Sequence, residues 1–164
     1  MKISLDKFDI LQSLAQLPQL QSVNNLEFQE NSLLCSITLD SKQLGVIGMP
    51  ENWIVELNFG HTNETMTASL KILSNAETKL GKTANKIAQK MLNGIINLIG
   101  LEEKIIGSIK LPEFASSEGN SITIDMNRLL SSKLDCSVNI NSVNCRDNAL
   151  TFDFYVDFEL PEQL

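Results

Sequence analysis

The segment from Leu150 to Leu160 alternates apolar and polar residues without a break, and this pattern constrains the fold more than any other feature. Alternation with a period of two is typical of a β-strand that buries one face and leaves the other in water. The water-facing positions are Thr151, Asp153, Tyr155, Asp157 and Glu159. We therefore expect a long strand near the C-terminus whose apolar face is covered by the rest of the fold.

Shorter alternating runs occur through the first half of the chain. They lie around Leu26–Phe28, Leu33–Leu39, Leu44–Met49, Trp53–Phe59 and Met66–Ile72. The connections between them are too short for a parallel crossover, so the runs predict an antiparallel meander.

A further alternating run precedes the C-terminal strand and changes phase along its length. Val138 and Ile140 share one parity, whereas Val143 and Cys145 occupy the other. A β-bulge near Asn141 or Ser142 would explain the change of phase. The segment Arg146-Asp147-Asn148 then predicts a hairpin turn into the last strand.

Helical periodicity occurs in three places. Residues 5–17 predict a short amphipathic helix with Ser4 as its cap, and residues 76–99 predict a longer one whose apolar residues share one broad face. Asp125 is a candidate cap for a helix of one or two turns. The segment from Pro112 to Asn120 is rich in turn-forming residues and predicts a linker.

These elements define an α+β fold. We expect a curved antiparallel sheet of roughly seven or eight strands, packed on one long amphipathic helix from about residue 76 to 99, with a short N-terminal helix. The chain has 164 residues, of which 43% are hydrophobic, so it can form a single domain over 1–164.

The charge of the chain excludes some classes of partner. There are 13 basic and 20 acidic side chains, for a net charge of −7, which argues against a nucleic-acid-binding surface. No uncharged apolar run is long enough for a transmembrane segment, and the first residues lack the apolar core of a signal peptide. Three cysteines without a CxxC pair fit a reducing compartment. We expect a cytoplasmic protein with reduced, mostly buried thiols.

Catalytic signals are weak in this sequence. The single histidine, His61, lies in a polar loop, and too few ligands surround it in sequence for a zinc site. Asp157 and Glu159 could form a pair of carboxylates of the kind used by glycosidases. A solvated acidic face that discourages edge pairing explains the same residues. Phosphate-binding loops are also absent. We therefore expect neither a metal nor a cofactor, and a hydrolase is only a minority alternative.

The predicted long helix carries a row of basic residues opposite its apolar face. They are Lys79, Lys82, Lys86 and Lys90. An ordinary solvated helix face would account for them. They could also attract an anionic partner, such as lipid headgroups, an acidic protein face or an acidic region of a second copy.

The order of elements resembles that of tubular lipid-binding (TULIP-like) domains, in which a curved antiparallel sheet wraps around a long amphipathic helix. The resemblance rests on the predicted helix, the segment from Ile122 to Leu130, and the strands Val138–Cys145 and Leu150–Leu160. It implies a non-enzymatic domain with an apolar groove between helix and sheet that accepts acyl chains.

Two non-enzymatic functions follow. The first is a binding or interaction module that holds a lipid or another apolar ligand between helix and sheet. Its candidate lining residues are Trp53, Phe59, Met91, Ile95, Leu98, Phe154 and Phe158. The alternative is a protein-assembly component, in which the basic helix face meets the acidic strand face of a protein partner or of a second copy in a homo-oligomer.

Overall fold

The fold consists of two antiparallel sheets that share one apolar core. In this computed structural model, the described residues are 1–17, 20–45, 52–75, 100–131 and 135–158. The strands are β1 (Lys2–Asp6), β2 (Leu20–Gln29), β3 (Ser32–Leu39), β4 (Asn52–His61), β5 (Thr65–Asn75), β6 (Ala115–Glu118), β7 (Ser121–Asp125), β8 (Cys136–Arg146) and β9 (Ala149–Phe158). The helices are α1 (Lys7–Leu14), α2 (Ser41–Leu44), α4 (Leu101–Gly107) and α5 (Met126–Ser131).

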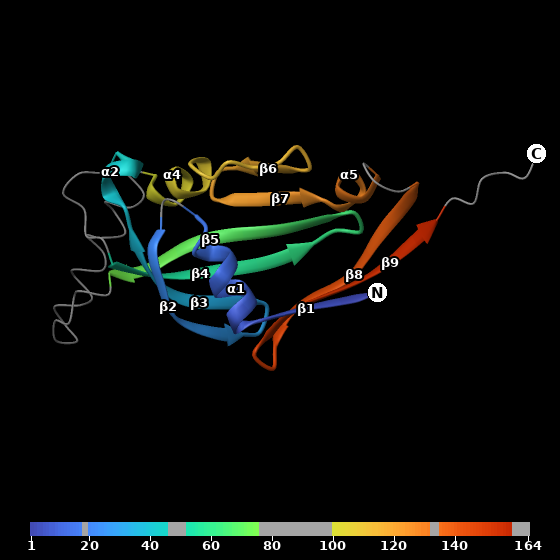
Figure 1. Cartoon of the computed structure of the whole chain (residues 1–164), viewed down its shortest axis with the longest axis horizontal. Helices are drawn as coiled ribbons and strands as arrows, with labels where there is room; N and C mark the ends of the chain where they lie inside the picture. Colours follow the sequence, from blue (N-terminus) through green and yellow to red (C-terminus); the bar gives the residue numbers. More distant parts are fainter. Residues whose placement is uncertain (18–19, 46–51, 76–99, 132–134, 159–164) are drawn as a thin grey trace, which may run out of the picture.

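We call the larger sheet, with strand order β2-β3-β4-β5-β7-β6, sheet B, and the smaller one, with order β1-β9-β8, sheet A. Strands β2 to β5 pair in sequence order, which confirms the antiparallel meander for four of its five predicted runs. Strand β8 contacts β2, β4 and β5 of sheet B. Figure 1 shows sheet A running obliquely across one end of sheet B, with the C-terminal end of β9 extending beyond it.

The predicted architecture of one curved sheet on one long helix is wrong for this chain. The described residues form two sheets and only short helices, and none of them belongs to a long helix packed on a sheet. The predicted helix at about 76–99 lies outside the described residues. Hydrophobic periodicity shows which face of a strand is buried, but it does not show which strands pair.

The core lies between the inner faces of the two sheets. Alternate residues of β3 are buried, and Trp53 and Val55 of β4 are 0% and 1% exposed. In sheet A, the alternate apolar residues of β8 and β9 face inward. Buried residues of both sheets form one cluster, which fixes the position of sheet A against sheet B.

The N-terminal segment differs in part from its prediction. A short N-terminal helix is present, but residues 2–6 form strand β1 and the cap is Asp6 rather than Ser4. The Asp9 N–H donates to Asp6 Oδ1 at 2.9 Å, and the Asp6 N–H donates to Asp9 Oδ2 at 3.0 Å. This capping box starts α1 directly after β1, and Ile10 is the buried residue of the helix.

The segment predicted as a linker is a hairpin. Strand β6 pairs with β7, and Gly119 makes the turn with φ of +58°. The Asn120 side chain donates to the Leu70 carbonyl at 2.9 Å, and the Leu70 N–H donates to the Asn120 carbonyl. Residues that favour turns therefore mark a tight β-turn tied to β5.

Two further short helices, α4 and α5, contact the strands of the sheets. Asp125 Oδ1 accepts from the Arg128 N–H at 3.0 Å, which confirms Asp125 as the cap of α5. Helix α4 buries Leu101, Ile105 and Ile106, and its Glu102 accepts the Ile72 N–H at 2.8 Å. The predicted strand at 44–49 begins in α2, and its residues from 46 onward lie outside the described residues.

Candidate functional site

A β-bulge in β8 arranges the solvent-facing side of sheet A, which we call the outer face. The register of β8 against β9 shifts between Ile140 and Ser142, which confirms the bulge predicted there. Before the shift Val138 and Ile140 are buried, and after it Val143 and Cys145 are buried. The extra residue of the bulge therefore keeps the apolar side chains of β8 on the inner face along its whole length. It also brings Ser142 and Asn144 to the outer face.

The hairpin turn ends the outer face at one side. Asp147 and Asn148 have φ of +53° and +58°, the left-handed pair that a two-residue hairpin turn requires. The turn confirms the prediction made from Arg146-Asp147-Asn148. It places Arg146 and Asp147 beside the end of β1, because Asp6 pairs with Ala149.

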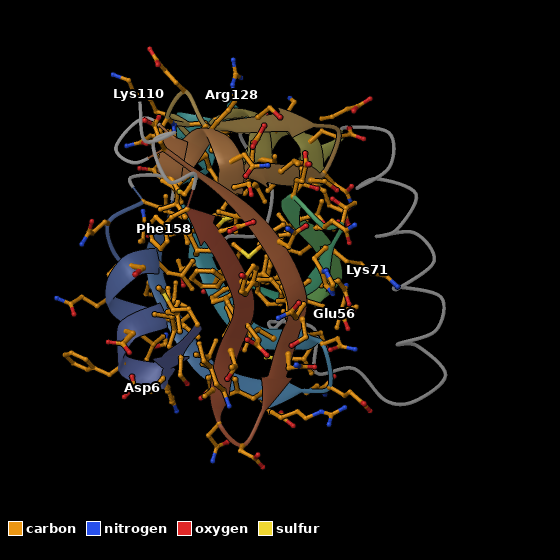
Figure 2. The ribbon with its side chains drawn as sticks, turned by 90° about the vertical axis from the view of Figure 1, so that its right-hand side faces the viewer. Asp6, Glu56, Lys71, Lys110, Arg128 and Phe158 are labelled. Atoms are coloured by element: carbon orange, nitrogen blue, oxygen red, sulfur yellow. The ribbon has the colours of Figure 1, made fainter. Side chains whose placement is uncertain are left out.

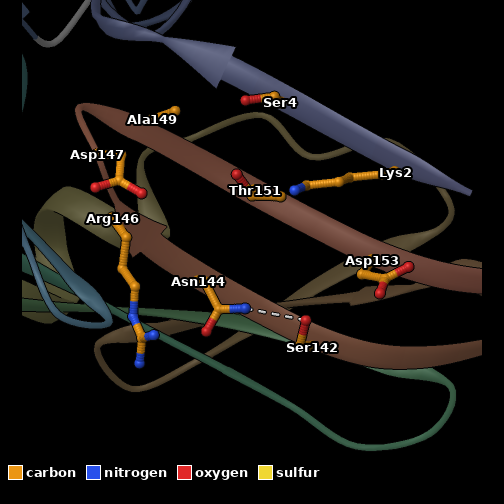
Figure 3. A pocket seen from close by; sticks show the side chains of 9 residues that line it. All are labelled: Lys2, Ser4, Ser142, Asn144, Arg146, Asp147, Ala149, Thr151 and Asp153. Carbon is orange, nitrogen blue, oxygen red and sulfur yellow. Dashed lines mark hydrogen bonds between the residues drawn. The ribbon is translucent and has the colours of Figure 1, made fainter.

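A polar hollow of about 600 Å³ lies on this part of the outer face (Figure 3). It is half-open, and it draws on all three strands of sheet A and on the turn between β8 and β9. Its lining residues are Lys2, Ser4, Ser142, Asn144, Arg146, Asp147, Ala149, Thr151 and Asp153.

Charges of both signs surround the hollow. Lys2 and Asp153 are direct cross-strand partners, and Figure 3 shows both on the same side of the sheet. Arg146 donates to Glu30 Oε1 at 2.8 Å, but the two side chains are 62% and 72% exposed, so the pair contributes about 0–1 kcal/mol. The guanidinium therefore stays accessible to a ligand.

Uncharged hydrogen-bonding groups fill the space between the charges. Asn144 Nδ2 donates to Ser142 Oγ at 3.0 Å, and Ser4 and Thr151 face each other across β1 and β9. The hollow thus offers donors and acceptors within one small area. Such an arrangement suits recognition by hydrogen bonds and charge pairing.

Tyr155 extends the same face beyond the hollow. It follows Thr151 and Asp153 at the next outward positions of β9, pairs with Asn139 of β8, and is 58% exposed. Asp157 is the following outward residue and is also exposed. The expected polar side of the last strand is therefore confirmed for its described residues, and Glu159 lies outside them.

The explanation offered for this acidic side, that it discourages edge pairing, does not apply where β9 is paired on both sides. It stays a prediction for Asp157, which lies beyond the described pairing with β1. Strand β9 is the central strand of sheet A, paired with β1 through Asp153 and with β8 along its whole length. Its acidic residues therefore do not protect a free edge over 149–153. They contribute charge to a sheet face that is open to solvent.

The residues predicted to line an apolar groove lie in different surroundings. Trp53 and Phe154 are buried in the core, and Phe59 packs against the core from β4. Phe158 is 56% exposed at the end of β9 (Figure 2). The other predicted residues lie outside the described residues: Met91, Ile95 and Leu98 of the apolar set, and Lys79, Lys82, Lys86 and Lys90 of the basic set.

His61 is exposed at the end of β4, next to the turn into β5, as expected for a surface histidine. Its Nδ1 lies 3.2 Å from the Thr62 carbonyl oxygen. Within the described ranges, no cluster of three or more His, Cys, Asp or Glu side chains could hold a metal ion. In the same ranges, no helix has both the length and the apolar character needed to cross a bilayer.

The thiols match the expectation of free and mostly buried cysteines. Cys35 and Cys145 are buried and Cys136 is half-buried, and all three are free. Burial raises the pKa of Cys35 from 9.0 to about 11. Burial also raises the pKa of Cys145, against a smaller lowering by a hydrogen bond with the Gln29 backbone. The inner thiols therefore stay protonated at neutral pH and react slowly.

We predict that native protein at pH 8 reacts quickly with a thiol reagent such as Ellman's reagent at Cys136 alone. Denaturant should release the reactions of Cys35 and Cys145, because both are then solvated. A Cys136→Ser variant should lose the fast phase, and fast reaction of a second thiol would contradict the burial of the inner cysteines.

The raised pKa of Cys35 also predicts a dependence of stability on pH. The folded state holds the thiol proton more tightly than the unfolded chain, so this contribution is complete below pH 9.0 and is lost as pH rises toward about 11. The fall in unfolding free energy over this range should be smaller in a Cys35→Ala variant. Parallel denaturant titrations of both proteins at pH 8 and pH 10.5 test this expectation.

Sequence reasoning missed the part of the site contributed by β1 and by β8 after its bulge. Ser4 was assigned as the cap of a helix and Lys2 to no element, although Lys2-Ile3-Ser4-Leu5-Asp6 alternates polar and apolar residues. That alternation was the available signal. Ser142 and Asn144 follow from the bulge, but only the sheet pairing brings them beside β1.

The chain matches no family model, no curated protein and no solved structure. The interpretation of the outer face therefore rests on its own geometry and chemistry.

Proposed function

We propose that the protein is a non-enzymatic assembly component that binds a protein partner through the outer face of sheet A. The observation that carries this proposal is the half-open polar hollow of about 600 Å³, with the exposed Tyr155 next to it. A small ligand is usually enclosed over most of its surface, whereas a protein partner can cover an open face.

The residue types of the outer face support a protein partner. Tyrosine and arginine are enriched among residues that dominate binding energy, and Tyr155 and Arg146 are both exposed here. Serine and asparagine, which line the hollow, form adaptable hydrogen bonds in protein-binding surfaces. The face is supported from behind by the buried residues of β8 and β9, so it is held rigid before binding.

The charges of the outer face indicate the chemistry of the partner. Lys2 and Arg146 lie at the hollow, whereas Asp153 and Asp157 follow each other along β9. A partner surface with hydrogen-bonding groups and a basic patch opposite β9 would complement this pattern. The lysines at 79, 82, 86 and 90 are one candidate source of such a patch, in a second copy of the chain.

A photo-crosslinking amino acid in place of Tyr155 tests the proposal in cells of the source organism. We expect a discrete protein adduct from this position and none from Glu118, an exposed residue of β6 in sheet B. The same adducts from both positions, or no adduct from position 155, would refute a specific partner at the outer face.

We further predict that Tyr155→Ala lowers recovery of the crosslinked partner about tenfold, because truncation of a central aromatic residue typically removes at least 1 kcal/mol of binding. Affinity capture at matched concentration, followed by quantitative mass spectrometry, measures the change. Glu118→Ala is the control and should leave recovery unchanged. Native mass spectrometry of the same preparations distinguishes a co-purified lipid, which would favour the apolar-ligand function instead.

A further inference from the structure

Strand β1 forms an edge of sheet A that no other described strand pairs with. The Phe154 N–H donates to the Met1 carbonyl, and the Met1 amino group donates to the Phe154 carbonyl. Backbone groups of an antiparallel strand point to alternate sides, so odd-numbered residues of β1 face β9 and even-numbered ones face the free edge. The N–H and C=O groups of Lys2 and Ser4 are therefore directed away from β9.

Exposed apolar side chains gather at this edge. Among the described residues, Met1 is 70% exposed, Ile3 is 45% exposed, and Phe8, just after the strand in α1, is 71% exposed. An open edge is a template for another strand, and the charges that often protect such edges, here Lys2 and Asp6, are of opposite sign and can pair with those of a second copy. An open edge flanked by apolar side chains indicates an interface.

The sequence of β1 is complementary to itself when it is read in the opposite direction. With Ser4 at the centre of an antiparallel pair, Lys2 lies opposite Asp6 and Ile3 lies opposite Leu5. Lys2, Ser4 and Asp6 share the outer face, whereas Ile3 and Leu5 share the inner face with their partners Phe152 and Leu150. Apart from the central Ser4–Ser4 pair, each cross-strand pair in this register is thus either a pair of opposite charges or a pair of apolar residues.

The direction of the backbone groups fits the same register. Ser4 turns both its N–H and its C=O to the free edge, so two copies of Ser4 can exchange two hydrogen bonds on a two-fold axis. Ile3 and Leu5 then form the non-hydrogen-bonded pairs, in which side chains approach more closely. The Asp6 N–H is already used by Asp9 in the capping box, so in the Lys2–Asp6 pair only the Lys2 N–H can donate, and the full exchange of two bonds is made by the Ser4 pair.

We propose that two copies of the chain pair antiparallel along β1, about a two-fold axis at Ser4, so that their copies of sheet A form one continuous sheet. The pairing would also bring the exposed apolar side chain of Ile3 opposite Leu5 of the other copy. Lys2 and Ser4 also line the polar hollow, so the dimer places two hollows side by side. The pairing does not depend on the proposed function, because Tyr155 lies beyond the described extent of β1 on β9.

Sedimentation velocity of the full chain over a concentration series, at low and at physiological ionic strength, tests the pairing. We expect a monomer–dimer equilibrium that weakens with added salt. Lys2→Glu should raise the dimer dissociation constant about tenfold or more, because it converts two attractive pairs into two repulsive ones. Asp6→Lys should do the same. An equimolar mixture of the two variants should form a heterodimer, because both charge pairs are then complementary again.

A second variant keeps the test decisive if Asp6→Lys does not fold after losing its helix cap. Ser4→Pro removes an N–H that faces the free edge and leaves the odd-numbered hydrogen bonds to β9 in place, so it should abolish the dimer and preserve the fold. Lys2→Arg is the matched control and should dimerise as the natural chain does. Thermal unfolding of the variants confirms that each is folded.

Two results would overturn the proposal. The first is a natural chain that stays monomeric up to the highest concentration reached at low salt. The second is a dimer that persists unchanged in both Lys2→Glu and Ser4→Pro, which would place the interface elsewhere. Tyr155→Ala separates the two interfaces, because it should lower partner recovery and leave the dimer intact: Tyr155 lies beyond the described extent of β1 on β9.

Discussion

Replacing Trp53 by alanine should lower the free energy of unfolding by about 3–5 kcal/mol. Trp53 is completely buried between the sheets and belongs to the core cluster that joins them. Its removal loses the transfer energy of a large apolar side chain and leaves a cavity that the close-packed surroundings fill only in part. A domain of this size is usually stable by about 5–15 kcal/mol, so the variant would be only marginally folded.

Urea unfolding followed by far-ultraviolet circular dichroism measures this loss. Fluorescence does not serve, because Trp53 is the only tryptophan in the chain. Tyr155→Ala is the control, since the Tyr155 side chain is 58% exposed and its removal should change stability by less than about 1 kcal/mol. Equal effects of the two substitutions would contradict the buried position of Trp53.

Replacing Asn127 by alanine should lower the free energy of unfolding by about 1–3 kcal/mol, the usual effect of leaving a buried backbone group without its hydrogen bond. Asn127 Oδ1 accepts the Val138 N–H at 2.8 Å, and Val138 is 1% exposed. The bond ties α5, which follows sheet B, to β8 of sheet A. A second hydrogen bond also joins β8 to the sheet B side of the fold, because the Ile140 N–H donates to the Asn63 carbonyl at 2.7 Å.

Loss of the Asn127 bond should act mainly where the two sheets meet. Amide hydrogen exchange should therefore speed up at Val138 and its neighbours in β8 more than in the centre of sheet B. Asn139→Ala is a matched control, because Asn139 is exposed on the outer face of the same strand region. If Asn139→Ala lost as much stability as Asn127→Ala, the hydrogen bond from the Val138 N–H to Asn127 Oδ1 would not be the cause.

Several local features of the structure could be predicted from the sequence. The phase change around Asn141 predicted the bulge of β8, Arg146-Asp147-Asn148 predicted the hairpin turn, and Asp125 predicted the cap of α5. Each of these features depends on residues that are neighbours along the chain. Their geometry is set by short-range sterics and hydrogen bonds, which a single sequence expresses directly.

The arrangement of the strands could not be predicted from the sequence in the same way. A single curved sheet on a long helix was expected, whereas β1, β9 and β8 form a separate sheet. Strand β1 is only five residues long and helix α1 starts at the next residue, so the end of the strand was predicted as part of the helix. Pairing between residues 2–6 and 149–153 is a contact between distant parts of the chain, and no local preference encodes it.

The candidate site shows the same division. The outward row of Thr151, Asp153 and Tyr155 was predicted from alternation, and the structure places it on an open sheet face. The hollow also requires Lys2 and Ser4 from the start of the chain and Ser142 and Asn144 from β8. Only the sheet register brings these residues together.

The sequence by itself determined which side of the predicted strands is apolar, where the turn between β8 and β9 and the cap of α5 lie, and that the last strand carries an acidic outer side. The tertiary structure decided that this strand is central rather than at an edge, and that β1 is the strand with an unpaired side. Side-chain periodicity is a property of one strand, whereas a neighbour is selected by how all apolar faces are buried together.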